Sequence, residues 1–112
     1  MPYTEINDIE EFKDIISKQD CVVIYSAKWC KSCCEYENAY NVISNLDEYT
    51  DVPIYKIDID KVEDCKDRCN ITSIPLTVIY KDSNETSRFV GNNQRKLVDF
   101  INEYIITIPV SP

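Results

Sequence analysis

The residues of this chain best suited to redox chemistry are Cys30 and Cys33, which lie three positions apart. They follow an apolar run over residues 21–25 and precede a segment with apolar residues at helical spacing. The pair is therefore predicted at a strand-to-helix junction, where unsatisfied backbone N–H groups and the helix dipole favour negative charge. A thiolate at Cys30 would be stabilised there, and the thiolate is the form that attacks a disulfide. Two intervening residues let the second thiol close a ring with the first, so the spacing predicts a redox-active dithiol.

Length and composition indicate one globular domain. The 112 residues are 44% hydrophobic, which is enough to bury a core without disulfide staples. We therefore expect a single domain over residues 1–112, with a short disordered tail from about residue 108. The formal charge of −8 argues against nucleic acids and anionic membranes as partners. No apolar run approaches the roughly 20 residues that a membrane-spanning helix needs.

Cysteine and histidine usage narrows the compartment and the chemistry. Six cysteines in a short chain also occur in secreted disulfide scaffolds. Here several of them fall inside predicted helices and strands, and residues 1–11 lack the basic and apolar regions of a secretory signal. We therefore expect an intracellular redox protein, located in the cytoplasm. The absence of histidine excludes Cys-His dyads, Ser-His-Asp triads and histidine-ligated metals.

Apolar periodicity predicts helices that alternate with strands, without internal repeats or linkers. The first helix has one apolar stripe, formed by Ile9, Phe12, Ile15 and Ile16. In order, the pattern predicts a helix that begins at Asn7, a buried strand over 21–27, a helix to about Glu48, a strand over 52–59, a short helix from Asp60 to about Asn70, strands over 76–80 and 86–90, and a helix from Asn92 or Asn93 that Pro109 and Pro112 end.

Local motifs support these boundaries. Asn7 with Glu10, and Asp60 with Glu63, have the spacing of capping boxes at helix starts. The turn residues 82–84 predict a hairpin between the last two strands. The resulting order, βαβαβαββα, implies an α/β fold with a five-stranded mixed sheet and four flanking helices. In such open sheets the reactive site lies at the carboxyl ends of the strands, which is where Cys30 falls.

Four separated segments of the chain match the pattern of a known family: Ala27-Lys28-Trp29-Cys30-Lys31-Ser32-Cys33, Lys56-Ile57-Asp58-Ile59-Asp60, Ile74-Pro75-Leu76-Thr77 and Val90-Gly91. Through these segments the chain resembles the thioredoxin family, over about residues 5–106. The resemblance implies the thioredoxin fold and a thiol–disulfide oxidoreductase that reduces protein disulfides, with roles in electron transport and cell redox homeostasis. It implies no cofactor or metal, and a thioredoxin reductase or equivalent dithiol donor as partner.

The resemblance also implies roles for individual residues. Cys30 would be the nucleophile that forms a mixed disulfide with the substrate, and Cys33 the resolving thiol that displaces the reduced substrate. Trp29 would pack beside the dithiol and line the substrate groove. The groove would continue along Ile74 and a cis Pro75, whose neighbouring backbone pairs with an extended substrate segment. Gly91, the only glycine of the chain, matches the glycine near this groove.

The chain departs from the family pattern on the central strand. Thioredoxins usually carry a buried acid there, five residues before the tryptophan, and this chain has Ile24 instead. The acid is thought to accept the proton of the resolving thiol, so Cys33 lacks an obvious base unless water, Glu35 or Asp58 serves. Lys56 matches the lysine that normally pairs with the acid. We expect it either to turn to Asp58 on the same strand face or to be solvated.

A second departure lies between the two active-site cysteines, where Lys31-Ser32 replaces Gly-Pro. A lysine beside the thiols would stabilise the thiolate, hence the reduced form, and make the couple more oxidising. We therefore predict a potential above about −270 mV, moving toward the disulfide isomerase range of about −180 mV. The alternative is that Lys31 points into solvent and shifts the potential little. Because of Lys31 and Ile24, an oxidase or isomerase of the same fold is the second candidate function within the enzyme class.

The remaining four cysteines allow several interpretations. Cys34 directly follows the dithiol and is either a bystander or a competing disulfide partner. Cys21 is most simply a small core residue. Cys65 and Cys69 share one helical stripe, and are either core residues or a second redox pair or regulatory site.

Two functions of a different class also fit the sequence. The set Cys30, Cys33, Cys65 and Cys69 can be written as a zinc or iron–sulfur site. A thioredoxin-fold interaction module with a vestigial dithiol is the other. The intact cysteines and tryptophan favour the enzyme, which we expect to be a monomer.

Overall fold

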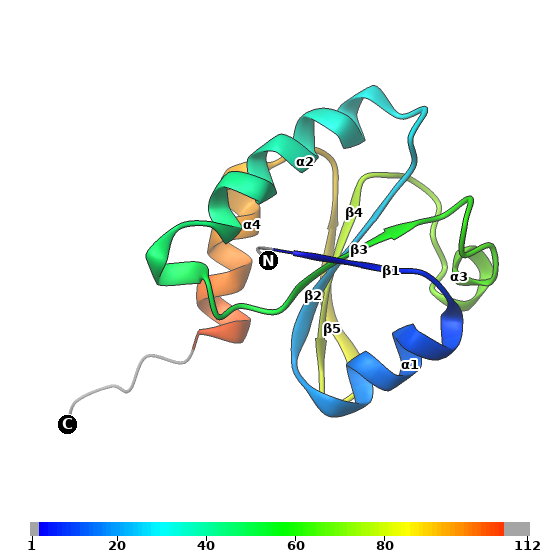
Figure 1. Cartoon of the computed structure of the whole chain (residues 1–112), viewed down its shortest axis with the longest axis horizontal. Helices are drawn as coiled ribbons and strands as arrows, with labels where there is room; N and C mark the ends of the chain where they lie inside the picture. The colour runs from blue at the N-terminus through cyan, green and yellow to red at the C-terminus, as the bar shows by residue number, and fades with distance from the viewer. Residues whose placement is uncertain (1–2, 107–112) are drawn as a thin grey trace.

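A computed structural model describes residues 3–106, so the expected tail from about residue 108, with Pro109 and Pro112, lies outside the described part. Strands and helices alternate along the chain in the predicted order (Figure 1). They are β1 (Thr4–Ile6), α1 (Ile9–Lys18), β2 (Cys21–Ser26), α2 (Lys31–Ser44), a 3₁₀ turn η1 (Asp47–Tyr49), β3 (Ile54–Asp58), α3 (Asp64–Arg68), β4 (Leu76–Lys81), β5 (Asn84–Val90), α4 (Gln94–Phe100) and a π-helical turn η2 (Ile101–Ile105). The sequence pattern assigned no residues to β1.

The five strands form one mixed sheet in the order β1-β3-β2-β4-β5. The first three run parallel, β4 is antiparallel to β2, and β5 is antiparallel to β4. Helices α1 and α3 cover one face and α2 and α4 cover the other (Figure 1). This is the predicted α/β architecture of a five-stranded mixed sheet with four flanking helices.

The central strand β2 is buried along its whole length. Val23 and Tyr25 pack into the core under α1 and α3, while Val22 and Ile24 pack into the core under α2 and α4. A strand covered on both faces is apolar at successive positions rather than at alternate ones, which explains the continuous apolar run. β2 therefore ends at a fixed place, directly before the segment that carries the two active-site cysteines.

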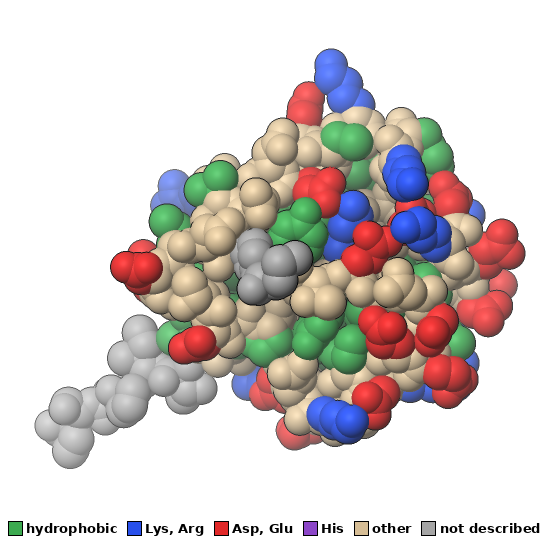
Figure 2. All heavy atoms as spheres, viewed as in Figure 1, with side chains coloured by type: hydrophobic (Ala, Val, Ile, Leu, Met, Phe, Trp, Pro, Cys, Tyr) green, Lys and Arg blue, Asp and Glu red, His purple; other side chains and the backbone are tan. Residues whose placement is uncertain are grey.

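The two outer strands of the sheet are short or polar. β1 has three residues, and β5 exposes most of its polar side chains. Figure 2 shows acidic side chains scattered over this side of the molecule, with lysines and arginines among them.

Two of the predicted helix starts are wrong, because the N-cap residues differ from those expected. α1 is capped by Asp8, not Asn7, and the Asp8 carboxylate accepts the Glu11 backbone N–H at 2.8 Å. The predicted capping box of Asp60 and Glu63 does not form, since Glu63 is the N-cap and makes no side-chain capping bond. Asp60 instead accepts a hydrogen bond from the Trp29 indole, so its carboxylate serves the active-site loop.

Helix α2 ends at Ser44, several residues before the predicted end. The side chains of Ser44 and Asn45 both donate to the Asn41 carbonyl, at 2.9 and 2.8 Å. Such local side-chain bonds compete with the helical backbone pattern. The chain then turns at Leu46, whose backbone is extended, and continues as η1.

The β4–β5 hairpin turns at Asp82 and Ser83, and Asn84 already belongs to β5. Both turn residues have positive φ, 53° and 69°, which matches the twist that two-residue hairpin turns require. The hairpin predicted from residues 82–84 is therefore confirmed, with a strand that begins two residues earlier than expected.

The structure decides between the two asparagines predicted to cap the last helix. Asn93 is the N-cap, and its side-chain oxygen accepts the Lys96 backbone N–H at 3.0 Å. We expect Asn93→Ala to lower the free energy of unfolding by about 1 kcal/mol, because the helix loses this cap. The exposed neighbour Asn92 caps nothing, so Asn92→Ala is the matched control and should change little. Urea denaturation of both variants tests this, and equal losses would contradict the assignment.

Candidate active site

Cys30 and Cys33 form a disulfide at the junction of β2 and α2, with Cα atoms 5.2 Å apart. Cys30 is the N-cap of α2 and has an extended backbone, with φ −89° and ψ 108°. Its sulfur accepts the Cys33 backbone N–H at 3.1 Å. The predicted position at a helix N-terminus is thus confirmed. One free N–H of the first helical turn points at the sulfur that would carry negative charge in the reduced protein.

Trp29 directly precedes Cys30 in the sequence, and its exposed indole is fixed by a hydrogen bond that it donates to Asp60. Trp29 is 70% exposed, and its Nε1 donates to the Asp60 carboxylate at 2.8 Å. A groove of about 290 Å³ lies between Trp29 and the segment 71–74, and Ile74 lines it. An exposed aromatic side chain fixed by a hydrogen bond suits contact with another molecule.

Pro75 follows Ile74 and connects the groove to the start of β4 and the end of β5. The Ile74–Pro75 peptide bond is cis, as the resemblance implied. The Gly91 N–H donates to the Pro75 carbonyl at 2.8 Å, which joins the end of β5 to the start of β4. Gly91 has a φ of +109°, a conformation that a residue with a Cβ rarely adopts, so glycine is required there.

The lysine beside the thiols lies on the outside of the molecule. Lys31 is the first residue of α2 and is exposed. Within residues 3–106 it makes no ion pair or side-chain hydrogen bond. Its charge is therefore screened by water, which weakens its effect on the thiols.

Lys56 pairs with Glu37, so the two expectations for it, a pairing with Asp58 or a simply solvated side chain, are both wrong. Its Nζ lies 2.9 Å from the Glu37 carboxylate on α2, and Glu37 also accepts the Tyr3 hydroxyl at 2.7 Å. Burial acts to raise the pKa of Glu37, but the bonds from Lys56 and Tyr3 outweigh it and hold the pKa below its usual value. Ile24 offers no carboxylate on the central strand, and Lys56 pairs with Glu37 on α2.

Glu37 is a residue of the site that sequence reasoning missed. It stands four positions after Cys33 on α2, so helical spacing places both on one face of the helix. A pocket of about 110 Å³ behind the disulfide is lined by Cys33, Glu37, Lys56 and Asp58, among others. The four-residue spacing was the available signal, although spacing alone does not show which face of the helix turns toward the sheet.

Two carboxylates were considered as bases for Cys33, and the structure separates them. Asp58 lies at the end of β3, is 5% exposed and lines the pocket with Cys33. Its Oδ1 accepts the Asp60 backbone N–H at 2.9 Å. Glu35 is exposed and does not line the pocket. Asp58 is therefore the one of these two that shares a pocket with Cys33.

Three of the other cysteines are buried, and all four are free thiols. Burial raises the pKa of Cys21 to about 12 and that of Cys65 to about 11, which suppresses the reactive thiolate. Cys34 alone is exposed, and its thiol donates weakly to the Lys28 carbonyl at 3.7 Å.

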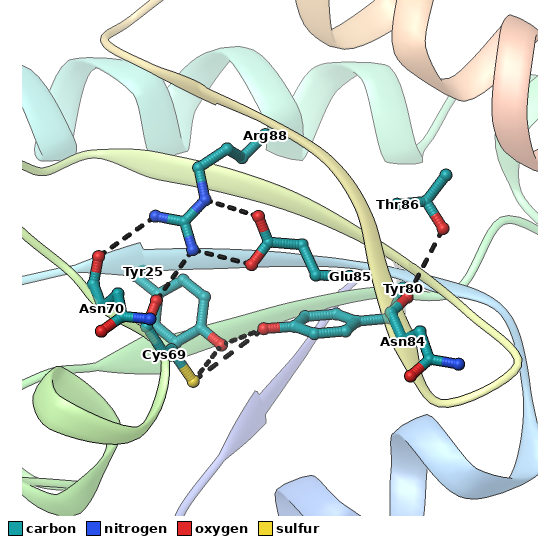
Figure 3. A network of polar contacts seen from close by, with 8 residues as sticks. All are labelled: Tyr25, Cys69, Asn70, Tyr80, Asn84, Glu85, Thr86 and Arg88. Atoms are coloured by element: carbon teal, nitrogen blue, oxygen red, sulfur yellow. Dashed lines mark hydrogen bonds and ion pairs between the residues drawn. The ribbon is translucent and has the colours of Figure 1, made fainter.

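Cys69 belongs to a network of polar contacts that runs from the core to the surface (Figure 3). Its sulfur accepts the Tyr25 hydroxyl at 3.2 Å, and the Arg88 guanidinium donates to its backbone carbonyl at 2.8 Å. Arg88 also binds Glu85, and donates to the Asn70 carbonyl at 3.2 Å. These contacts tie the end of α3 to β5 and favour the interpretation of Cys69 as a core residue.

The structure gives no support to the alternative with a metal. Among residues 3–106, no three Cys, Asp or Glu side chains are grouped as metal ligands would be. The cysteines of the zinc or iron–sulfur alternative are thus not arranged as a coordination site. Across the same residues, no helix has the length and apolar character needed to cross a membrane.

Comparisons with known proteins agree with this geometry. The thioredoxin family model matches residues 4–103. Thioredoxin 1 of Plasmodium falciparum is 32% identical over 95 residues, 84% of this chain and 89% of that protein. Thioredoxin of Ophiophagus hannah is 29% identical over 103 residues, 89% of this chain and 96% of that protein.

Solved structures show the same similarity. A structure of Plasmodium falciparum thioredoxin has a TM-score of 0.83 and 29% identity, covering 90% of this chain and 98% of that one. A thioredoxin from Malassezia sympodialis shares the fold, with a TM-score of 0.84 over 91% of this chain and 90% of that one. With the Cys30–Cys33 disulfide at the start of α2, the chain belongs to the thioredoxin family and is a protein thiol–disulfide oxidoreductase.

Proposed function

We propose that the protein works as a reductase of protein disulfides, with Cys30 as nucleophile and Cys33 as resolving thiol. The observation that carries this assignment is the position of Cys30 at the N-cap of α2, where the Cys33 N–H points at its sulfur. In the reduced protein this N–H donates to a thiolate, and hydrogen bonds to charged acceptors are about twice as strong as neutral ones. Cys30 is therefore the thiol that ionises and attacks.

The reaction moves two electrons from the dithiol to the substrate. The Cys30 thiolate attacks one sulfur of a substrate disulfide, and the other substrate sulfur leaves as a thiolate. Cys33 then attacks the Cys30 sulfur of the mixed disulfide and releases the second substrate thiol. The product is the Cys30–Cys33 disulfide of this structure, which a reductase reduces again.

The substrate groove is formed by Trp29, Ile74, Pro75 and Gly91. Trp29 and Ile74 line one groove, and the Pro75 carbonyl is bonded to Gly91, which supports a shared surface beside the dithiol. An extended segment of the substrate pairs with the backbone here, as in other peptide sites that use strand addition.

We further propose that the protein acts in the cytoplasm as a monomer. The chain has four free cysteines, and one of them, Cys34, is exposed. This suits a reducing compartment, in which thiols stay reduced. A monomer leaves the exposed Trp29 free for substrate and reductase.

Replacing the resolving thiol should trap the intermediate. We expect Cys33→Ser to accumulate a mixed disulfide with insulin, because Cys30 still attacks and nothing displaces the substrate. Mass spectrometry under non-reducing conditions measures the adduct. Cys34→Ser, which removes the adjacent exposed thiol, is the control and should turn over normally. An adduct in Cys34→Ser but not in Cys33→Ser would reverse the assignment.

The potential of the couple tests the effect of Lys31. We expect a value above about −270 mV, and Lys31→Gln should lower it by about 5–20 mV because an exposed cation is screened. Equilibration in glutathione buffers measures both, in a Cys34→Ser background. Lys81→Gln, at the hairpin end of β4, is the matched control. An unchanged potential in Lys31→Gln would assign no role to this charge, and a value near −180 mV would favour an isomerase or oxidase.

A further inference from the structure

Resolution of the mixed disulfide requires that Cys33 lose its proton in a poorly hydrated place. Cys33 is 3% exposed, and burial disfavours the charged thiolate that must attack. The pocket of about 110 Å³ that Cys33 lines gives the proton a route away from the sulfur. A water occupies about 30 Å³ of liquid volume, so the pocket has room for water beside the thiol.

The charged groups that face this pocket are Lys28, Glu37, Lys56 and Asp58. The two lysines are cations and cannot accept a proton. Glu37 is engaged by Lys56 at 2.9 Å and by the Tyr3 hydroxyl at 2.7 Å, and these bonds hold the pKa of its carboxyl low. Glu37 is therefore a weak base, which leaves Asp58.

Asp58 has the properties that the step needs. It is 5% exposed and forms no ion pair within the described residues. One of its oxygens, Oδ1, accepts the Asp60 N–H, and the chain over residues 3–106 offers no hydrogen-bond donor to Oδ2. Lys56 lies two positions earlier on the same strand face, but Glu37 holds it and so leaves Asp58 without a neutralising cation.

Resting on the function proposed above, we propose that Asp58 is the proton acceptor for Cys33 during resolution. The proton passes from Cys33 Sγ through a pocket water to Asp58 Oδ2. The Cys33 thiolate then attacks Cys30 Sγ, the bond between Cys30 and the substrate sulfur breaks, and the substrate sulfur leaves with the electron pair. It is protonated by solvent. When the reductase attacks the Cys30–Cys33 disulfide in the next cycle, Asp58 returns its proton to Cys33.

The two half-reactions can be followed separately with the aromatic disulfide DTNB, in a Cys34→Ser background that removes the other exposed thiol. Attack by Cys30 releases a first equivalent of the coloured thiolate, and resolution by Cys33 releases the second. We expect Asp58→Asn to leave the first phase unchanged. We expect it to slow the second at pH 7 by at least tenfold, toward the roughly 10²-fold that a positioned base typically contributes.

The slow phase of Asp58→Asn should recover as the pH rises, because hydroxide then replaces the missing base. Glu35→Gln, the exposed carboxylate on α2, is the charge-matched control and should behave like the parent. Asp58→Glu should restore most of the rate with a shifted pH midpoint, and it serves as the test if Asp58→Asn does not fold. An unchanged second phase, or a loss that persists at high pH, would overturn the role of Asp58. Absence of the first phase in the parent protein would instead overturn the proposed function.

Discussion

The site depends on the burial of β2 in the middle of the sheet. Because both faces of this strand are covered, its end is fixed relative to α2, and the chain has only residues 27–30 in which to pass from β2 to α2. That short passage places Cys30 at the N-cap. Cys30 is thus positioned by the packing of β2 from Val22 to Tyr25, together with its own contacts at the start of α2.

Most elements of the fold could be predicted from the sequence, because the sequence patterns that indicate them involve neighbouring residues. The apolar run of β2, the stripe on α1 and the turn at Asp82 and Ser83 reflect burial and backbone preferences of neighbouring residues. The same holds for Cys30 at a helix start. The cis bond before Pro75 was different in kind, since only the family resemblance pointed to it.

The predictions that proved wrong concern side chains whose partners lie far away in the sequence. Asp60 was predicted to cap a helix, but its carboxylate accepts a hydrogen bond from the indole of Trp29, which lies 31 positions earlier in the sequence. Lys56 was expected to choose between its own strand and solvent, and it binds Glu37 on a helix that crosses the sheet. Such choices are decided by which side chains the fold brings together, and no periodicity encodes them. Position 24 is a buried isoleucine, and the charged pair behind the dithiol joins Lys56 of β3 to Glu37 of α2.

The edges of the sheet have a consequence for how the protein meets other chains. A sheet edge offers unpaired backbone groups to any extended segment, and long apolar edges therefore promote aggregation. Here one edge, β1, spans three residues, and the other, β5, presents Glu85, Arg88 and other polar side chains. Neither edge therefore favours pairing with an extended segment of another chain, so the edges of the sheet do not compete with the proposed groove beside Trp29 for extended substrate.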